Sequence, residues 1–298
     1  VSCCRWYWAA PGASVSAPPD GAARLRRALH EGQAVLGVRL SRLREANEHD
    51  VHQCRVDSRR LRALLKSFGS FFSAEQALRH RAALERVADL LAEIRGLYVL
   101  AAQPPLRSGP CVRELAAARQ QAVKRLARRL QSRSNRAAVE LLARGPCRGN
   151  LGLRGGIADV DVLRRARRSW RRAQRLLEPR PRTRRQLHQL RIRLKNCRYI
   201  LEIVADVSLT NAATLRRRLR DAQQNLGDRR DAEAAADWLQ SDPARAARSG
   251  VARRSLQRSL QRLDQDLDPA LERLAQAGKR WDHAITRLIE LDLKGPAG

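Results

Sequence analysis

The chain repeats one pattern of basic residues: a His followed by cations at the third, seventh and tenth positions after it. The first copy is His52, Arg55, Arg59 and Arg62, and the second is His188, Arg191, Lys195 and Arg198. On an α-helix, with about 100° per residue, these positions fall within a stripe about 80° wide. Guanidinium and ammonium groups along one face suit phosphate oxygens, and an imidazole adds hydrogen-bond donors. The repeat therefore indicates a surface that binds an anion.

A solvated helix surface is the ordinary alternative for such a stripe. An exposed face usually mixes charges because like charges at i, i+4 repel, whereas neither copy has a carboxylate at these positions. The pattern also persists between segments that differ elsewhere, since Asp57 in the first copy corresponds to Arg193 in the second. We therefore favour a binding surface. By their spacing, Lys66 and Arg184 extend the two stripes, and Glu202 is expected to pair with Arg198.

The composition predicts a polyanionic partner. The 298 residues contain 60 Lys and Arg against 30 Asp and Glu, a formal charge of +30, which favours nucleic acid, an acidic membrane surface or inorganic polyphosphate. Only five of the basic residues are Lys; a GC-rich genome accounts for part of this bias, but the resulting guanidinium surface suits phosphate. Aromatic residues make up only 4%, which argues against a base-stacking platform.

Hydrophobic residues recur at helical spacing almost throughout, and no segment alternates as a β-strand does. The predicted fold class is therefore all-α. Helices are expected near 21–46, 49–72, 74–102, 111–131, 134–144, 157–177, 184–206, 211–227, 229–241, 247–265 and 268–290. Residues 1–20 are predicted to be an unstructured extension and not a signal peptide, because they lack a basic start and a true apolar stretch.

A second repeated block supports an internal duplication. Residues 91–96 match residues 226–231 at an offset of 135, and the His residues repeat at an offset of 136. Two repeated blocks with nearly the same offset predict two antiparallel helical bundles related by a pseudo-twofold axis. The halves are expected at about 21–145 and 151–292. Such an arrangement can place both basic stripes on one shared groove.

The sequence lacks the usual signatures of an enzyme or a metal protein. The six Cys include no C-x-x-C pair, so a reduced, cytosolic protein without a zinc site or disulfide framework is expected. The cations near His52 and His188 repel a metal ion. No phosphate-binding Gly-rich loop or Ser/His/Asp arrangement is evident, and no run approaches the roughly 18 apolar residues of a membrane span. We predict a protein without catalytic residues, metal or cofactor.

The doubled H-x-x-R-x-x-x-[RK]-x-x-R pattern in an all-helical chain resembles the CHAD domain, the conserved histidine α-helical domain, over residues 21–292. The resemblance implies two four-helix bundles around a basic cavity that binds inorganic polyphosphate, and association with cytoplasmic polyphosphate granules. It assigns phosphate binding to the eight residues of the two stripes. Family members often follow an Arg of the first bundle with acidic residues. Here Arg95 precedes Gly96, whereas the second half keeps Arg230 before Asp231; both arginines are included among the candidate ligands.

These observations lead to one expected function and two alternatives. We expect polyphosphate to bind in a basic groove between two bundles, for targeting to or organising polyphosphate granules. The main alternative is nonspecific nucleic-acid binding by the same arginine surface. A polyphosphate-processing enzyme is disfavoured, because the chain lacks the E-x-E-x-K signature of the triphosphate-tunnel module and has few carboxylates near the stripes.

Overall fold

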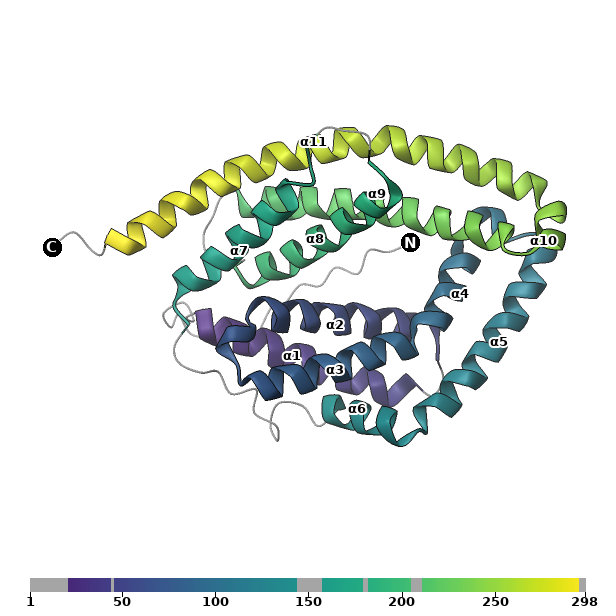
Figure 1. The fold of residues 1–298 in the computed structure, drawn as a ribbon, viewed down its shortest axis with the longest axis horizontal. Helices are drawn as coiled ribbons and strands as arrows, with labels where there is room; N and C mark the ends of the chain where they lie inside the picture. The colour runs from purple at the N-terminus through teal and green to yellow at the C-terminus, as the bar shows by residue number, and fades with distance from the viewer. Residues whose placement is uncertain (1–20, 44–45, 144–156, 179–181, 205–210, 295–298) are drawn as a thin grey trace, which may run out of the picture.

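The computed structural model describes residues 21–43, 46–143, 157–178, 182–204 and 211–294 (Figure 1). Its α-helices are α1 (Gly21–Arg42), α2 (Glu48–Ser67), α3 (Ala74–Leu90), α4 (Ala92–Ala102), α5 (Pro110–Leu130), α6 (Arg133–Ala143), α7 (Asp159–Gln174), α8 (Arg184–Ile203), α9 (Ala212–Gln240), α10 (Pro243–Arg248) and α11 (Gly250–Lys294). Two short 3-10 helices, η2 (Gly69–Phe71) and η3 (Pro104–Leu106), complete the described elements, which include no strand. The predicted all-α class is confirmed. The predicted extension at 1–20 lies outside the described residues.

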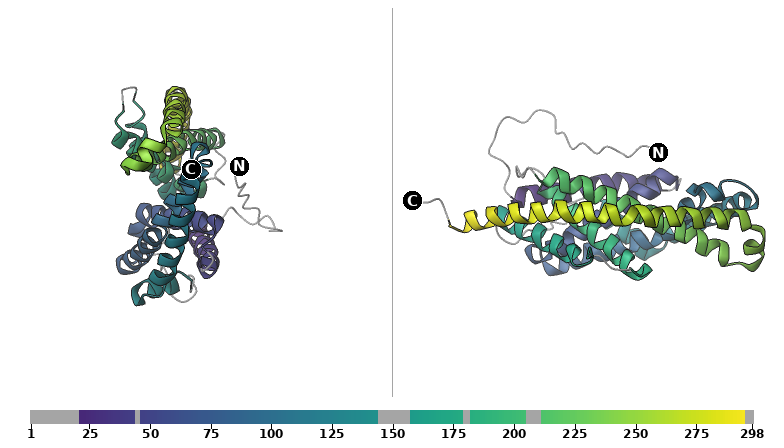
Figure 2. Two further views of the ribbon diagram at one scale, coloured as in Figure 1. Left: turned by 90° about the vertical axis from the view of Figure 1, so that its right-hand side faces the viewer. Right: turned by 90° about the horizontal axis from the view of Figure 1, so that it is seen from above.

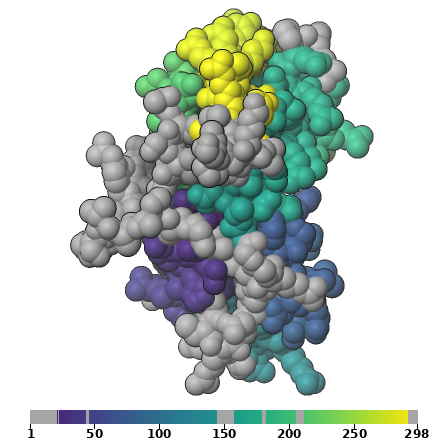
Figure 3. Space-filling view, turned by 90° about the vertical axis from the view of Figure 1, so that its left-hand side faces the viewer, coloured from purple at the N-terminus to yellow at the C-terminus, as the bar shows by residue number. Residues whose placement is uncertain are grey.

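The helices pack in two groups that lie one above the other (Figures 1 and 2). Helices α1, α2, α3 and α6 contact one another in the first group, and α7, α8, α9 and α11 form the second. Contacts of α2 with α8, and of α1 with α7 and α8, join the groups. Figure 3 shows the end of the molecule where α7 lies between α1 and α11. The predicted pseudo-twofold between the halves stays a prediction.

One apolar core runs through both groups and fixes their relative position. It extends from Leu25 in α1 to Ile289 in α11 and includes the fully buried Trp170 and Trp281. A Cβ on Gly278 would lie 1.6 Å from Cζ2 of Trp170, so only glycine lets α11 approach α7 this closely. Large aromatic side chains bury much apolar area, which makes this contact a strong anchor for α11.

A second, smaller core joins the groups at the opposite end of the molecule, where α4 and α5 extend to α10 (Figure 1). Leu106 and Leu115 pack there with Leu239 and Leu256. Beside this core, the guanidinium of Arg245 donates to the carboxylate of Glu114 and to the carbonyl of Trp238, and its Cζ lies 3.9 Å from the centroid of the indole ring. The two halves are therefore held together at both ends.

Three predicted helix divisions are wrong. The segment 74–102 is interrupted at Leu91, which divides it into α3 and α4. Conversely, the segments 211–227 and 229–241 form one helix, α9, and the segments 247–265 and 268–290 are joined in α11, which begins at Gly250 after the short helix α10. Gly227 and Pro269, which disfavour a helix interior, lie at these two predicted boundaries, but tertiary packing overrides local propensity. Around Pro269 the apolar side chains of Leu267 and Leu271 are buried and hold the helix in place.

None of the helices in the described part of the chain has both the length and the apolar character needed to cross a membrane.

Candidate functional site: a central basic cluster

Each predicted stripe lies on a helix whose start is capped. At α2 the side chain of Asn47 accepts from the backbone N of Asp50 at 2.8 Å, and at α8 Thr183 and Gln186 form a capping box. The apolar residues on the opposite faces of the two helices are buried, among them Leu61, Leu64, Leu65, Phe68, Leu190, Leu194, Ile200, Leu201 and Val204. Burial of these faces fixes the rotation of both helices and leaves the stripes on the remaining face.

The contact between α2 and α8 brings the two stripes together. The charge of Arg59 on α2 lowers the pKa of Lys195, Arg191 and His188 on α8, after the larger effect of burial on each group. In return, Lys195 contributes to the lowered pKa of His52. We define the central basic cluster as the ten side chains that this mutual repulsion links: His52, Arg55, Arg59, Arg62, Arg95, His188, Arg191, Lys195, Arg198 and Arg230.

Lys195 is the most strongly perturbed cation of the cluster. Burial, followed by repulsion from Arg59, Arg191 and Arg198, lowers the pKa of Lys195 to about 6. The carboxylate of Asp231 on α9 acts in the opposite direction but does not compensate. At neutral pH the empty cluster therefore holds Lys195 largely as a neutral amine, because a charged ammonium there lacks both water and enough counter-charge.

The two histidines differ in environment although they occupy equivalent sequence positions. His52 is half-buried, and burial followed by the charges of Arg95 and Lys195 lowers its pKa to about 4. His188 is exposed; desolvation and then the charge of Arg230 lower its pKa. Both imidazoles are therefore largely neutral at pH 7 and offer one N–H donor each.

Two donors of the cluster, Nε of Arg191 and Nε of Arg198, are buried without a hydrogen-bond acceptor among the described residues, and Arg191 shows the consequence most directly. The Nε of Arg191 is inaccessible and has no hydrogen-bond partner among the described residues. Its Nη2 lies 3.9 Å from the position that a Cβ would occupy on Gly227, so α9 passes close to this guanidinium. A buried unsatisfied donor is unfavourable by about 1–3 kcal/mol. An anion in the cluster would supply the missing acceptor.

The arginines of the first half are partly held by neighbouring helices. Nη1 of Arg55 donates to the carbonyl of Ala88 at 2.6 Å, and Nη2 of Arg62 lies 2.8 Å from Oε1 of Glu85. Each guanidinium carries five N–H donors in a fixed geometry, so these contacts orient the side chains and leave further donors for a ligand.

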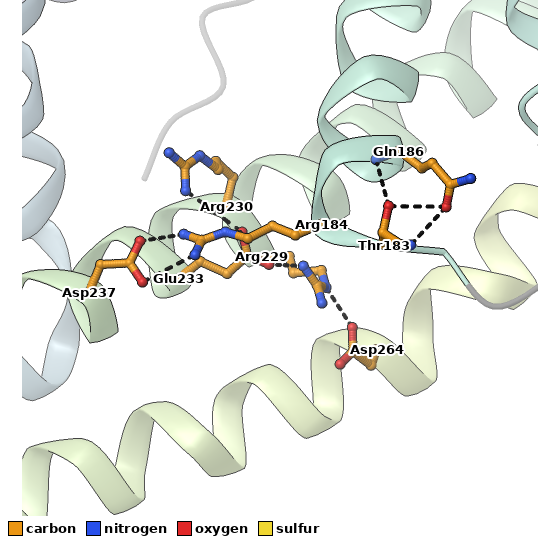
Figure 4. A network of polar contacts seen from close by, with 8 residues as sticks. All are labelled: Thr183, Arg184, Gln186, Arg229, Arg230, Glu233, Asp237 and Asp264. Carbon is orange, nitrogen blue, oxygen red and sulfur yellow. Dashed lines mark hydrogen bonds and ion pairs between the residues drawn. The ribbon is translucent and has the colours of Figure 1, made fainter. Parts of the chain in front are cut away.

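A network of ion pairs borders the cluster on the side of α9 (Figure 4). The carboxylate of Glu233, with a side chain only 11% exposed, contacts Arg229, lies 2.9 Å from Nε of Arg184 and lies 3.7 Å from Nη1 of Arg230. Asp237 also pairs with Arg184, and Asp264 pairs with Arg229 at 2.6 Å. Arg230 is thus the most weakly held of the three arginines.

The structure places the other predicted residues less centrally. Lys66 is exposed at the end of α2 and has no hydrogen bond or ion pair within the described residues, and Arg184 lies in the network at the edge of the cluster. The predicted pairing of Glu202 with Arg198 is confirmed at 3.8 Å, and Glu202 also pairs with Arg60 at 3.1 Å.

Three residues of the site were missed by sequence reasoning: Arg229, Asp231 and Glu233. The spacing of Arg229 and Arg230 to Glu233, at i+4 and i+3, was the available signal for the network. Across the described residues, no three His, Cys, Asp or Glu side chains gather as a metal site would require.

The helical fold and its two basic stripes can be compared with those of known proteins. The chain belongs to the CHAD domain family, whose model matches residues 23–240. Two solved structures have a similar fold: PptA from Streptomyces chartreusis, with a TM-score of 0.64 and 21% identity over 86% of this chain and 100% of that one, and the CHAD domain from the plant Ricinus communis, with a TM-score of 0.63 and 20% identity over 88% and 96%. A search of curated proteins found no match.

Proposed function

We propose that the protein binds linear inorganic polyphosphate through the central basic cluster and thereby associates with polyphosphate granules, without catalysing a reaction. The observation that carries this proposal is the convergence of cations from α2, α4, α8 and α9 on a partly desolvated site that lacks an equal number of carboxylates. Repulsion among these cations is unfavourable when the site is empty. A bound polymer with one negative charge per phosphate repeat would neutralise them and make the arrangement favourable.

Two features of the cluster would contribute directly to phosphate binding. A phosphate oxygen near Arg191 would accept the hydrogen bond that its buried Nε lacks. The ammonium form of Lys195, disfavoured in the empty cluster, would be stabilised by the adjacent anion. Phosphate oxygens alone can satisfy these groups, and the described helices contribute few aromatic side chains for base stacking. We therefore favour polyphosphate over nucleic acid as the ligand.

A competition experiment tests this choice. Labelled long-chain polyphosphate bound to the protein should be displaced by unlabelled polyphosphate at concentrations at least tenfold lower, per phosphate, than by duplex DNA or by RNA. Because bound cations release condensed counterions, six to eight phosphate contacts predict a slope of about −4 to −6 for log affinity against log salt, with the single-strand coefficient. Equal displacement by RNA would favour the nucleic-acid alternative, and a slope near zero would exclude an electrostatic site.

The network around Glu233 leads to a further prediction. In Glu233→Gln the side chain keeps its shape but loses the charge that holds Arg230 and Arg184. We expect polyphosphate affinity to rise about three- to tenfold, because the guanidinium of Arg230 is freed for contacts with phosphate while Asp237 still holds Arg184. The free energy of unfolding should fall by about 1–3 kcal/mol.

The matched control is Asp264→Asn, which removes a carboxylate of α11 whose ion pair among the described residues is with Arg229 alone. Its polyphosphate affinity should equal that of the parent protein. Filter binding gives the affinities and urea denaturation gives the stabilities. Weaker binding by Glu233→Gln would mean that the carboxylate positions the arginines instead of competing for them.

A further inference from the structure

A cavity separate from the central basic cluster lies between α7 and α11. Its volume is about 550 Å³. The residues that line it come from the C-terminal end of α7, from Leu177 and Glu178 just after this helix, and from the middle of α11. None of its lining residues belongs to the central basic cluster. The volume falls within the range of sites that take small organic ligands.

The rim of this cavity is held in place by a buried arginine. The side chain of Arg182 is 7% exposed and donates to the carbonyl of Leu177 at 3.1 Å, to the carbonyl of Glu178 at 2.9 Å and to Oδ1 of Asp268 at 3.0 Å. These contacts satisfy backbone carbonyls just after the end of α7, which would otherwise lack partners. The cavity is therefore bounded by a fixed segment.

The charges that line the cavity are only partly balanced. Nε of Arg167 lies 3.2 Å from Oδ1 of Asp282, and Nη2 of Arg171 lies 3.2 Å from Oδ2. The carboxylate of Asp282 is therefore already paired. Arg175 and Lys279 also line the cavity, and neither has an ion-pair partner within the described residues. Glu178 is the remaining carboxylate of the lining. Two unpaired cations against one exposed carboxylate favour a ligand with a single, compact anionic group.

The rest of the lining is suited to an uncharged part of the ligand. Leu177 and Ala275 supply apolar surface beside the cations, and the amide of Gln174 can donate and accept hydrogen bonds at the edge of a ring. Small-molecule sites combine apolar walls with a few polar groups in this way. A polymer of phosphates would leave the apolar surface unused.

We propose that the cavity between α7 and α11 binds a small phosphate monoester that carries a flat ring, of about the size of a nucleotide. A phosphate monoester carries a charge of about −1.5 to −2 at neutral pH, so Arg175 and Lys279 can both pair with it while Glu178 stays exposed to solvent. Its ring would lie against Leu177 and Ala275. This site is independent of the central basic cluster, and the proposal does not rest on polyphosphate binding.

Calorimetric titration of the full chain with AMP tests the proposal, with adenosine and inorganic phosphate as the two fragments. AMP should bind at least tenfold more tightly than either fragment, because only AMP uses both parts of the cavity. The double variant Arg175→Gln/Lys279→Gln should weaken AMP binding by about 10- to 100-fold, since each lost charge-assisted hydrogen bond corresponds to about tenfold in affinity. Ala275→Phe, which fills the apolar part without a change in charge, should abolish binding.

The control Arg172→Gln/Arg280→Gln removes the same charge from exposed positions of α7 and α11 that do not line the cavity, and should bind AMP like the parent. Loss of binding in this control would assign the effect to diffuse surface charge. Equal affinities for AMP and inorganic phosphate would exclude a role for the apolar wall. Absence of measurable heat at millimolar AMP, or retention of binding in Ala275→Phe, would overturn the proposal, whatever the outcome for polyphosphate.

Discussion

The double variant Arg59→Gln/Lys195→Gln should lose polyphosphate affinity by about 100-fold or more. Arg59 contributes to the lowered pKa of groups on both α2 and α8, so it lies where the two stripes meet, and Lys195 is the most deeply perturbed cation opposite it. Each charge-assisted hydrogen bond to phosphate is worth about 1.5–3 kcal/mol, and two of them correspond to roughly 10²- to 10⁴-fold in affinity. Filter binding at fixed salt and pH 7 measures the loss.

The control is Lys66→Gln/Arg193→Gln, which removes the same charge from the same two helices at exposed positions. We expect its affinity to fall by less than threefold, because exposed charges act only through the screened field of the protein. Far-ultraviolet circular dichroism and thermal unfolding should show that both variants keep the helical fold. If both pairs lose affinity equally, the ligand binds the whole basic surface and not a defined cluster.

Polyphosphate affinity should fall by up to about 100-fold between pH 6 and pH 8. The lowered pKa of Lys195, about 6 in the empty protein, results from burial and from Arg59, Arg191 and Arg198, against Asp231. A bound phosphate raises this pKa, so binding takes up a proton wherever the pH lies above the pKa of the empty site and below that of the complex. Linkage then lowers log affinity by at most one unit for each pH unit.

The histidines contribute at lower pH. The pKa of His52, about 4 in the empty cluster, rises towards its ordinary value when phosphate binds, so its proton uptake takes place above pH 4 and ends near pH 6.5. We therefore assign the dependence above pH 6 chiefly to Lys195. Calorimetry in buffers of different ionisation enthalpy counts the protons in each range.

Lys195→Arg is the decisive variant for this prediction. An arginine keeps the positive charge at all accessible pH values, so its polyphosphate affinity should be nearly constant between pH 6 and pH 8 while that of the parent falls. His52→Gln should leave the dependence above pH 6 intact. A parent protein with constant affinity in this range, or a Lys195→Arg variant as pH-dependent as the parent, would contradict the assignment to Lys195.

The two halves of the cluster are not electrostatically equivalent. Asp231 follows Arg230 in the second half, and burial raises its pKa despite the nearby Arg191 and Arg95. The corresponding position in the first half is Gly96, where a Cβ would meet no atom within 4 Å. The carboxylates that pair with the first half, Glu48 and Glu85, have side chains that are more than half exposed, whereas Glu233 in the second half is 11% exposed and acts with less screening by solvent. We expect the first half to contribute more of the net positive potential that attracts a polyanion.

The amino-acid sequence by itself determined the fold class, the two basic stripes and most of the cluster. Helical periodicity is a local property, and it placed the buried faces of α2 and α8 correctly because apolar residues at helical spacing must face a core. The doubled spacing of His and Arg selected residues that the structure brings together. Helix boundaries at Gly227 and Pro269 were wrong because local propensity is weaker than the packing of α9 and α11.

Only the tertiary structure decided which cations meet, which are neutralised and which are desolvated. Lys66 and Lys195 both lie in predicted stripes, yet Lys66 is exposed whereas Lys195 faces Arg59 across the contact of α2 with α8. The convergence of Arg184, Arg229 and Arg230 on Glu233 joins the start of α8 to α9, with a separation of 49 residues between Arg184 and Glu233. The cavity between α7 and α11 depends on contacts between segments about one hundred residues apart. Burial and charge–charge distance depend on how the helices pack against one another, and no periodicity within a single helix encodes them.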